Sequence, residues 1–191
     1  MSSFSRVLAM AASFEQPLED RLQKLQDELV AMIESDRHII VGARATMFYT
    51  RPRYTADIDY AVGRKQYGKT IRWLGQAGVS FTSEGEAILC SELRVDVIDA
   101  SRNEVIQEVL EQQRGVPSLE AVAALKYVAA ISPTRSYERK QQDAADLTAL
   151  VLCPEFDEGA FVRFLVGPYA DEVEKAKGIL ADIKAHRPTI L

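Results

Sequence analysis

Apolar residues recur along the chain at two different spacings, and these spacings predict where its helices and strands lie. In the first helix, apolar side chains fall every three or four positions, with charged residues between them, as in an amphipathic helix. Short apolar runs closed by glycine or proline predict buried strands and the turns after them. The expected elements are, in order, a helix at 17–35, a strand at 38–42, a short helix at 44–51, a strand at 55–62 and a helix at 64–78.

The second half of the chain has a different character. Residues 79–100 are rich in β-branched side chains around a glycine and predict two or three strands, the last at 94–100. Helical spacing then dominates, and the expected helices are at 103–113, 118–131, 135–152 and 157–185. The fold class predicted is therefore α+β: a mixed-sheet core with an N-terminal helix at 1–100, and a helical C-terminal part at 101–191 packed on that core.

Composition narrows the class of protein. The 191 residues are 47% apolar, which is enough to close a core without disulfides. The two cysteines, Cys90 and Cys153, have neither a disulfide-framework nor a zinc-finger spacing, and residues 1–15 contain too short an apolar run for a secretory signal. We therefore expect a cytoplasmic protein with no membrane segment. The net charge of −5 excludes a uniformly basic surface but not a local basic cleft.

Two aspartates interrupt the strand expected at 55–62. Asp57 and Asp59 are two positions apart, so in a strand their carboxylates project to the same side. Like charges this close repel unless one is protonated or a cation lies between them, and Mg²⁺ prefers carboxylate and phosphate oxygens. The alternative is a strand end where both side chains reach water or pair with nearby arginines, and these two residues alone leave both interpretations open.

A third acid and a glycine turn strengthen the metal interpretation. Asp96 lies between two valines in the last expected strand, and we prefer it to Asp99, which is nearer the strand end. Three such acids on adjacent strands would form a site for nucleotidyl or phosphoryl transfer. Gly42, fifteen residues before Asp57, closes a strand ahead of a helix, and such turns commonly hold phosphate through backbone N–H groups. Arg44 and Arg53 are candidate triphosphate contacts, and Lys126, on an otherwise apolar helix, is a third.

The order of these motifs resembles a known family. The order is similar to that of the nucleotidyltransferase superfamily with the DNA polymerase β catalytic fold. That family has a hydrophobic residue, a glycine and then a glycine or serine, followed after about a dozen residues by Asp-hydrophobic-Asp and later by a strand with a third acid. The stretch "IIVGARATMFYTRPRYTADIDYAV" looks most like the minimal bacterial nucleotidyltransferase toxins of the abortive-infection type, with Arg53 and Thr55 ahead of the aspartates. The resemblance covers residues 37–152.

The resemblance also implies roles for residues in the helical part. The helices at 118–131 and 135–152 match that group's lysine helix and its "(R/K)-x-x-D-x-x-D-L" helix. The matching residues are Lys126, Arg139 or Lys140, Asp143 and Asp146. By resemblance the catalytic residues are Asp57, Asp59, Asp96 and Lys126, the three aspartates bind Mg²⁺, and the nucleotide contacts are Gly42, Ala43, Arg44, Arg53, Thr55 and Asp143.

One residue departs from the family pattern and keeps two functions open. Ala43 stands where the family usually has glycine or serine. The alanine retains a backbone N–H but has no hydroxyl to contact phosphate. The first function is an enzyme that moves a nucleoside monophosphate from a nucleoside triphosphate such as ATP to a tRNA end, a protein hydroxyl or a small molecule, releasing pyrophosphate. The alternative is a catalytically silent module that binds a nucleotide or partner on the same fold. The toxin resemblance also implies an antitoxin partner.

Overall fold

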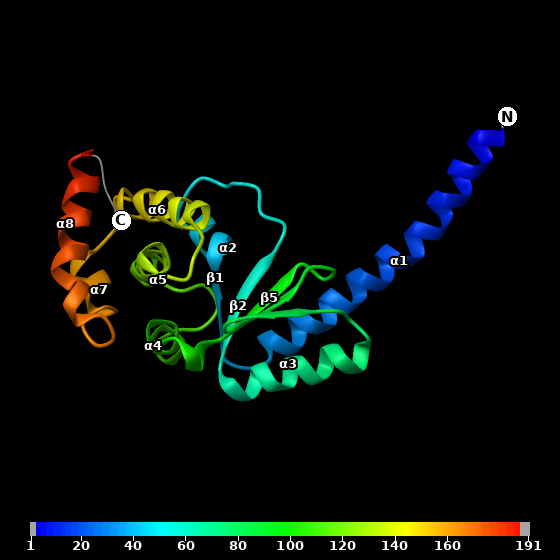
Figure 1. Cartoon of the computed structure of the whole chain (residues 1–191), viewed down its shortest axis with the longest axis horizontal. Coiled ribbons are helices and arrows are strands. Elements are labelled where there is room, and N and C mark those ends of the chain that lie inside the picture. Colours follow the sequence, from blue (N-terminus) through cyan, green and yellow to red (C-terminus); the bar gives the residue numbers. More distant parts are fainter. Residues whose placement is uncertain (1–2, 188–191) are drawn as a thin grey trace.

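The computed structural model describes the backbone of residues 3–187 and the side chains of residues 18–187. A mixed sheet lies between two groups of helices (Figure 1). The strands are β1 (His38–Val41), β2 (Ile58–Val62), β3 (Thr82–Glu84), β4 (Ala87–Cys90) and β5 (Val95–Asp99). The helices are α1 (Ser3–Glu34), α2 (Gly42–Met47), α3 (Arg64–Ala77), α4 (Glu104–Gln112), α5 (Leu119–Ile131), α6 (Tyr137–Val151), α7 (Glu158–Arg163) and α8 (Val173–Lys184), with 3₁₀ turns η1 (Ala100–Arg102) and η2 (Ala170–Glu172).

The five strands pair in the order β1-β2-β5-β4-β3. Only β2 and β5 run parallel; the other neighbouring pairs are antiparallel. Parallel strands need a long connection between them. Here α3 and the β3–β4 hairpin return the chain to the end of the sheet where β2 begins, so β5 runs in the same direction as β2. The prediction of an α+β fold with a mixed sheet is therefore confirmed.

Alternating side chains of each strand enter two separate cores. On one face, Tyr60 and Val97 pack with Leu29 of α1 and Leu74 of α3. On the other face, the inward residues of β1 and β2, such as Ala61, pack under α4, α5 and α6, and α7 and α8 lie outside those helices. The sheet thus has one face buried by the first part of the chain and one buried by residues after β5.

The structure corrects the predicted element boundaries at three places. β2 begins at Ile58 rather than at residue 55, because pairing with β5 starts where the Ile58 N–H donates to the Arg94 carbonyl at 3.0 Å. α1 starts near the chain's beginning rather than at residue 17, although the side chains of residues 1–17 lie outside the described ones. The helix expected at 157–185 is broken into α7, η2 and α8, because Pro168 cannot donate a helical hydrogen bond.

Two further expectations concern the chain as a whole. Within the part of the chain that the structure describes, no helix is both long enough and apolar enough to cross a lipid bilayer. The division into parts at 1–100 and 101–191 stays a prediction, although the change from sheet to helices does follow β5, which ends at Asp99.

Candidate functional site

Two aspartates lie side by side at the start of the parallel strands. Asp59 of β2 pairs in register with Asp96 of β5, so both carboxylates project from the same sheet face, the one covered by the later helices. Burial, followed by the negative charge of Asp96, raises the pKa of Asp59 to about 6. Burial also raises the pKa of Asp96, although the Cys90 N–H donates to its carboxylate at 3.2 Å and opposes the rise. The two acids therefore repel each other in a partly dehydrated place.

Asp57 completes the group without belonging to the strand. It lies in the loop just before β2, and its charge contributes to the raised pKa values of both Asp59 and Asp96. The Thr55 hydroxyl is 3.5 Å from the Asp57 carbonyl oxygen, so Thr55 supports the loop backbone. The structure thus brings the three predicted acids together at one end of two adjacent strands.

Asp99 is on the other face of the sheet and is fully paired. Its carboxylate accepts hydrogen bonds from Arg64 and from both the N–H and the hydroxyl of Ser101, and Arg102 is 3.6 Å away. Burial raises the pKa of Asp99, but these partners outweigh it and leave the pKa lowered. By contrast, Asp57 and Asp59 make no hydrogen bond or ion pair through their carboxylates with any residue in the described range.

The glycine turn lies directly against the acids. Gly42 follows Val41, which pairs with Asp59 across β1 and β2, and Gly42 has a φ of +64°. A Cβ atom at this position would overlap the Oδ2 atom of Asp59. Only glycine therefore allows both this backbone conformation and this close approach of the carboxylate. Ala43 and Arg44 follow in the first turn of α2, which is only six residues long.

Arg44 makes no ion pair with the three acids among the described residues. Its charge acts on Tyr60, whose side chain is on the opposite sheet face: burial and a hydrogen bond to Glu34 raise the pKa of the Tyr60 phenol, and Arg44 offsets part of that rise. The Arg44 Nε atom is buried and lacks a hydrogen-bond partner within the described residues. A contact between Arg44 and a nucleotide phosphate stays a prediction.

A buried chain of alternating charges faces the acids from the helical side. Lys126 of α5 is 7% exposed, and its Nζ atom lies 2.9 Å from Asp143 Oδ1 and 2.7 Å from Asp146 Oδ2. The two aspartates are three residues apart on α6 and so share one face of that helix. Arg135 Nη1 lies 2.8 Å from Asp143 Oδ2, and Arg53 Nη2 lies 3.0 Å from Asp146 Oδ2. Three cations and two anions leave this network with one net positive charge.

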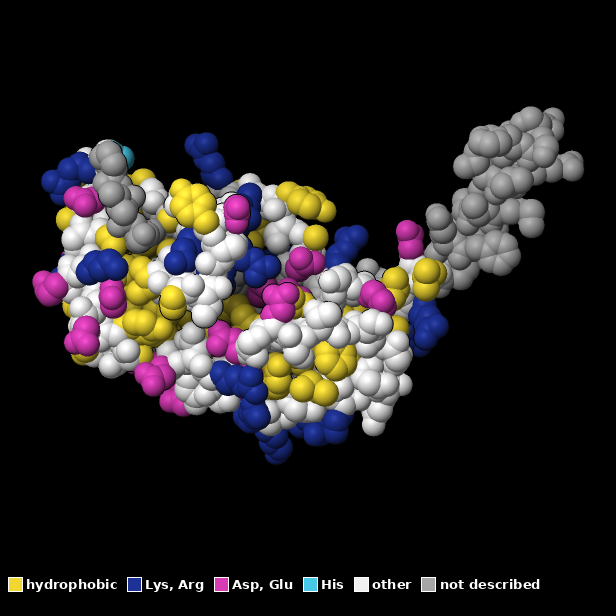
Figure 2. All heavy atoms as spheres, in the orientation of Figure 1, with side chains coloured by type: hydrophobic (Ala, Val, Ile, Leu, Met, Phe, Trp, Pro, Cys, Tyr) yellow, Lys and Arg dark blue, Asp and Glu magenta, His cyan; other side chains and the backbone are white. Residues whose placement is uncertain are grey.

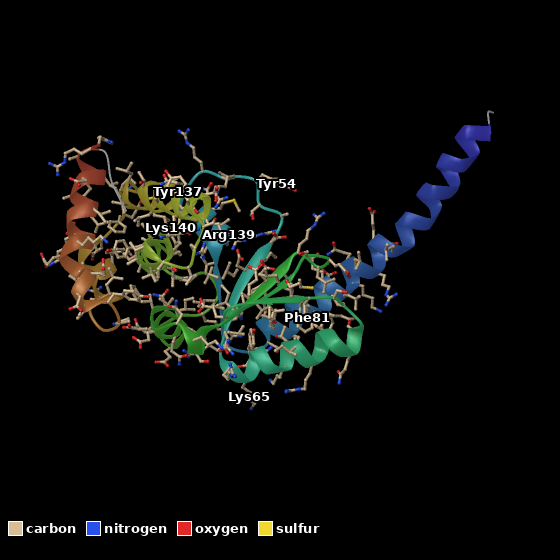
Figure 3. All side chains as sticks on the ribbon, in the orientation of Figure 1. Tyr54, Lys65, Phe81, Tyr137, Arg139 and Lys140 are labelled. Carbon is tan, nitrogen blue, oxygen red and sulfur yellow. The ribbon has the colours of Figure 1, made fainter. Side chains whose placement is uncertain are left out.

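The network and the acids act on each other electrostatically. The Lys126 and Arg135 charges both lower the pKa of Asp59 against its burial, and Arg139 does the same for Asp96. Figure 3 shows Arg139 of α6 on the side toward the start of β2, with Tyr54 in the loop before that strand, whereas Lys140 lies over the helical part, farther from β2. Arg135 was not predicted from the sequence. The signal available for it was a lone cation in the turn just before the Ser136 N-cap of α6.

A cavity of about 440 Å³ opens between the sheet and α5. One end is polar and is lined by Gly42, Asp59, Lys126, Arg135 and Asp143. The rest is mostly apolar, with Ile98 of β5, Ile106 of α4 and Leu125 of α5 among its walls. Figure 2 shows this hollow between the sheet and the helical part, with acidic and basic side chains around its mouth. The polar end matches a phosphate-bearing ligand and the apolar part a flat organic group.

The acids suit a divalent cation by their chemistry. They offer carboxylate oxygens, two of them have no other partner, and their mutual repulsion would fall if a cation lay between them. However, in the described part of the chain no three His, Cys, Asp or Glu side chains are gathered around a common centre as metal ligands would be.

Comparisons with known proteins give distant structural similarities. No protein-family model matches the chain, and no curated protein sequence matches it. The chain is similar to a solution structure of the antibiotic-resistance factor ANT(2'')-Ia, with 13% identity, a TM-score of 0.41 and coverage of 91% of this chain and 97% of that chain. It is also similar to a crystal structure of ANT(2'')-Ia in complex with adenylyl-2''-tobramycin, with 13% identity, a TM-score of 0.38 and coverage of 91% and 98%. Similarity at this level does not determine an activity.

Proposed function

We propose that the chain is a nucleotidyltransferase, which moves a nucleoside monophosphate from a nucleoside triphosphate to an acceptor hydroxyl. The observation that carries the proposal is the Asp59–Asp96 pair: two acids in register, one of them packed against Gly42, with Lys126 and Arg135 facing them across a cavity. This arrangement joins an anionic pair to a cationic wall, which is what a triphosphate and its counter-ions require.

The residues of the site divide the reaction between them. Arg135, half-exposed at the cavity wall, is placed to hold the β- and γ-phosphates, while Lys126 keeps Asp143 and Asp146 in position behind it. Asp96 accepts the proton of the acceptor hydroxyl, since burial raises its pKa and so makes it a stronger base. The acceptor oxygen then bonds to the α-phosphorus, the bond from the α-phosphorus to the bridging oxygen breaks, and pyrophosphate leaves.

Mg²⁺ belongs to this proposal as the ion that Asp57, Asp59 and Asp96 would hold. In the described residues their carboxylates are not gathered at one centre, so binding the ion would have to draw them together. Their oxygen ligands and their unneutralised charge support it. When bound, the ion would supply charge neutralisation at the phosphate oxygens. Every other contribution described above comes from side chains of the chain itself.

A catalytically silent nucleotide-binding module is the second candidate. Two observations favour it: Ala43 has no hydroxyl for phosphate, and both carboxylate partners of Lys126 are already within 3 Å of its Nζ atom. A silent module would still use the cavity to bind a nucleotide, but it would not require acids that lack a partner. The free carboxylates of Asp57 and Asp59 favour the enzyme.

Thermal stability tests both candidates. The melting temperature should rise with a nucleoside triphosphate and rise further with Mg²⁺, and the Mg²⁺-dependent part should disappear in Asp57→Asn and Asp59→Asn. Asp20→Asn, an exposed aspartate on α1, is the matched control and should respond like the unaltered chain. If no triphosphate shifts the melting temperature, with or without Mg²⁺, both candidates fail.

The acceptor and the cellular role extend this proposal. The acceptor must supply a hydroxyl from which Asp96 can accept the proton. A tRNA end, a protein side chain and a small molecule can each supply one. The toxin and antitoxin relationship rests on the sequence resemblance at 37–152. It predicts that induced expression arrests bacterial growth and that Asp59→Asn removes the arrest.

A further inference from the structure

The apolar part of the cavity extends well beyond the phosphate end. The Asp99 N–H donates to the Glu86 carbonyl at 2.9 Å, so Glu86 lies beside Asp99 along β5. Asp59 lies beside Asp96 of the same strand. Asp96 and Asp99 are three residues apart, which corresponds to about 10 Å along a strand. The wall between them includes Ile98, Ile106 and Leu125. The cavity is therefore long enough to receive a ribose and a base when the phosphates lie at the acids.

Glu86 lines the far part of this cavity and has no partner. Its half-buried carboxylate makes no hydrogen bond or ion pair with any residue that the structure describes. The charges of Arg135 and Arg102 act on it from a distance, while burial raises its pKa. Its neighbour in the lining, Glu172, differs: the Tyr127 hydroxyl donates to Glu172 at 3.1 Å and Lys175 lies 3.4 Å away. A partly dehydrated carboxylate without a donor from the protein can accept hydrogen bonds from a ligand.

We infer that the apolar part of the cavity holds the nucleobase and that Glu86 selects it by accepting hydrogen bonds from its N–H groups. This inference rests on the proposed binding of a nucleoside triphosphate at the acids. A carboxylate offers two acceptor oxygens and no donor. Guanine presents two adjacent donors, N1–H and the N2 amino group, and so matches both oxygens. Adenine and cytosine present one amino group, and uracil presents carbonyl oxygens on both sides of a single N–H.

The expected order of affinity is GTP first, then ATP and CTP, and UTP last. A hydrogen bond to a charged group in a partly dehydrated site changes affinity by about tenfold or more. We therefore expect GTP to bind about tenfold more tightly than UTP. Glu86→Gln keeps the side-chain shape and replaces one acceptor with an amide donor. That amide should weaken GTP binding by about tenfold and strengthen UTP binding, because it can donate to a uracil carbonyl.

The test is the dissociation constant of each of the four triphosphates, measured by calorimetry on the unaltered chain, on Glu86→Gln and on the control Glu92→Gln. Glu92 is exposed in the turn before β5 and lies outside the cavity. Equal melting temperatures of the three proteins would show that each is folded. The inference is supported if GTP leads in the unaltered chain and in Glu92→Gln, and if Glu86→Gln removes or reverses that lead.

Four results would overturn the inference, and they separate it from the proposed function. Equal affinity for all four triphosphates would reject base selection while leaving nucleotidyl transfer intact. So would an unchanged order in Glu86→Gln. If Glu86→Gln instead changed only the turnover of an acceptor, the apolar part would be an acceptor pocket. No binding of any triphosphate would reject the proposed function together with the inference.

Discussion

Gly42 and Asp59 occupy the same small space: the carboxylate lies where a side chain on residue 42 would begin. The glycine has a φ of +64°, so an alanine there is strained as well as obstructed. Because Asp59 pairs in register with Asp96, displacing one carboxylate disturbs both. The turn that ends β1 therefore sets the geometry of the acids on β2 and β5.

Gly42→Ala should consequently lower the free energy of unfolding by about 1–3 kcal/mol and abolish triphosphate-dependent stabilisation. Urea denaturation and melting curves would measure the two effects. Gly63→Ala is the matched control, because nothing lies within 4 Å of its added Cβ and its φ is −68°. A Gly42→Ala protein as stable and as responsive as the control would contradict the proposed packing.

Lys126 is expected to be the principal cation holding Asp143 and Asp146 in place. Lys126→Met leaves two buried carboxylates facing each other with only half-exposed arginines nearby, so the free energy of unfolding should fall by about 3 kcal/mol at neutral pH. Adding Asp143→Asn and Asp146→Asn should restore part of that loss, because the repulsion is gone. Lys65→Met, at an exposed lysine of α3, should change stability by less than about 0.5 kcal/mol. No rescue by the asparagines would disprove this role.

The raised pKa of Asp59 predicts a pH-dependent stability difference. Below its ordinary value of 3.8 the carboxyl is protonated in both folded and unfolded chains, so it costs nothing. Between 3.8 and about 6 only the unfolded chain releases the proton, and the folded state loses up to about 3 kcal/mol as pH rises. Asp59→Asn should therefore be more stable than the unaltered chain at pH 8 and equal to it near pH 3.5. An equal difference at both pH values would refute the assigned shift.

Arg135 should matter for ligand binding more than for stability. Its guanidinium is half-exposed at the cavity wall, and it acts on both Asp59 and Asp143. Arg135→Ala should weaken triphosphate binding by about tenfold in calorimetry, with a smaller effect at high salt because screening reduces the contribution of the charge. Arg72→Ala, on the exposed side of α3, should leave the dissociation constant unchanged. Equal constants for the two variants would remove Arg135 from the site.

Much of the fold followed from spacing, and the failures have physical causes. The pattern around Asp57 and Asp59 predicted a strand, but the sequence alone does not show where pairing begins, so residues 55–57 were placed in β2 instead of the loop. The preference for Asp96 over Asp99 came from its flanking valines, and strand alternation does put these two acids on opposite faces.

Contacts that depend on tertiary structure were harder to predict. Arg135 and Glu86 come from turns far apart in the chain, and neither belongs to a periodic pattern that would direct it to the cavity. Arg44 was predicted to contact phosphate from its position after Gly42, but its Nε atom is buried and has no hydrogen-bond partner among the described residues. Sequence spacing identified the acids; packing decided which cations reach them.

Transfer of label from a nucleoside triphosphate tests the central claim most directly. The chain would be incubated with Mg²⁺, with total cell RNA, protein and small-molecule extract as acceptors, and with each triphosphate labelled at either the α- or the γ-phosphorus. Nucleotidyl transfer predicts that only the α-label becomes attached to an acceptor, that the γ-label leaves as pyrophosphate, and that Asp59→Asn stops both. Attachment of the γ-label, or no attachment of either label under any of these conditions, would contradict the account.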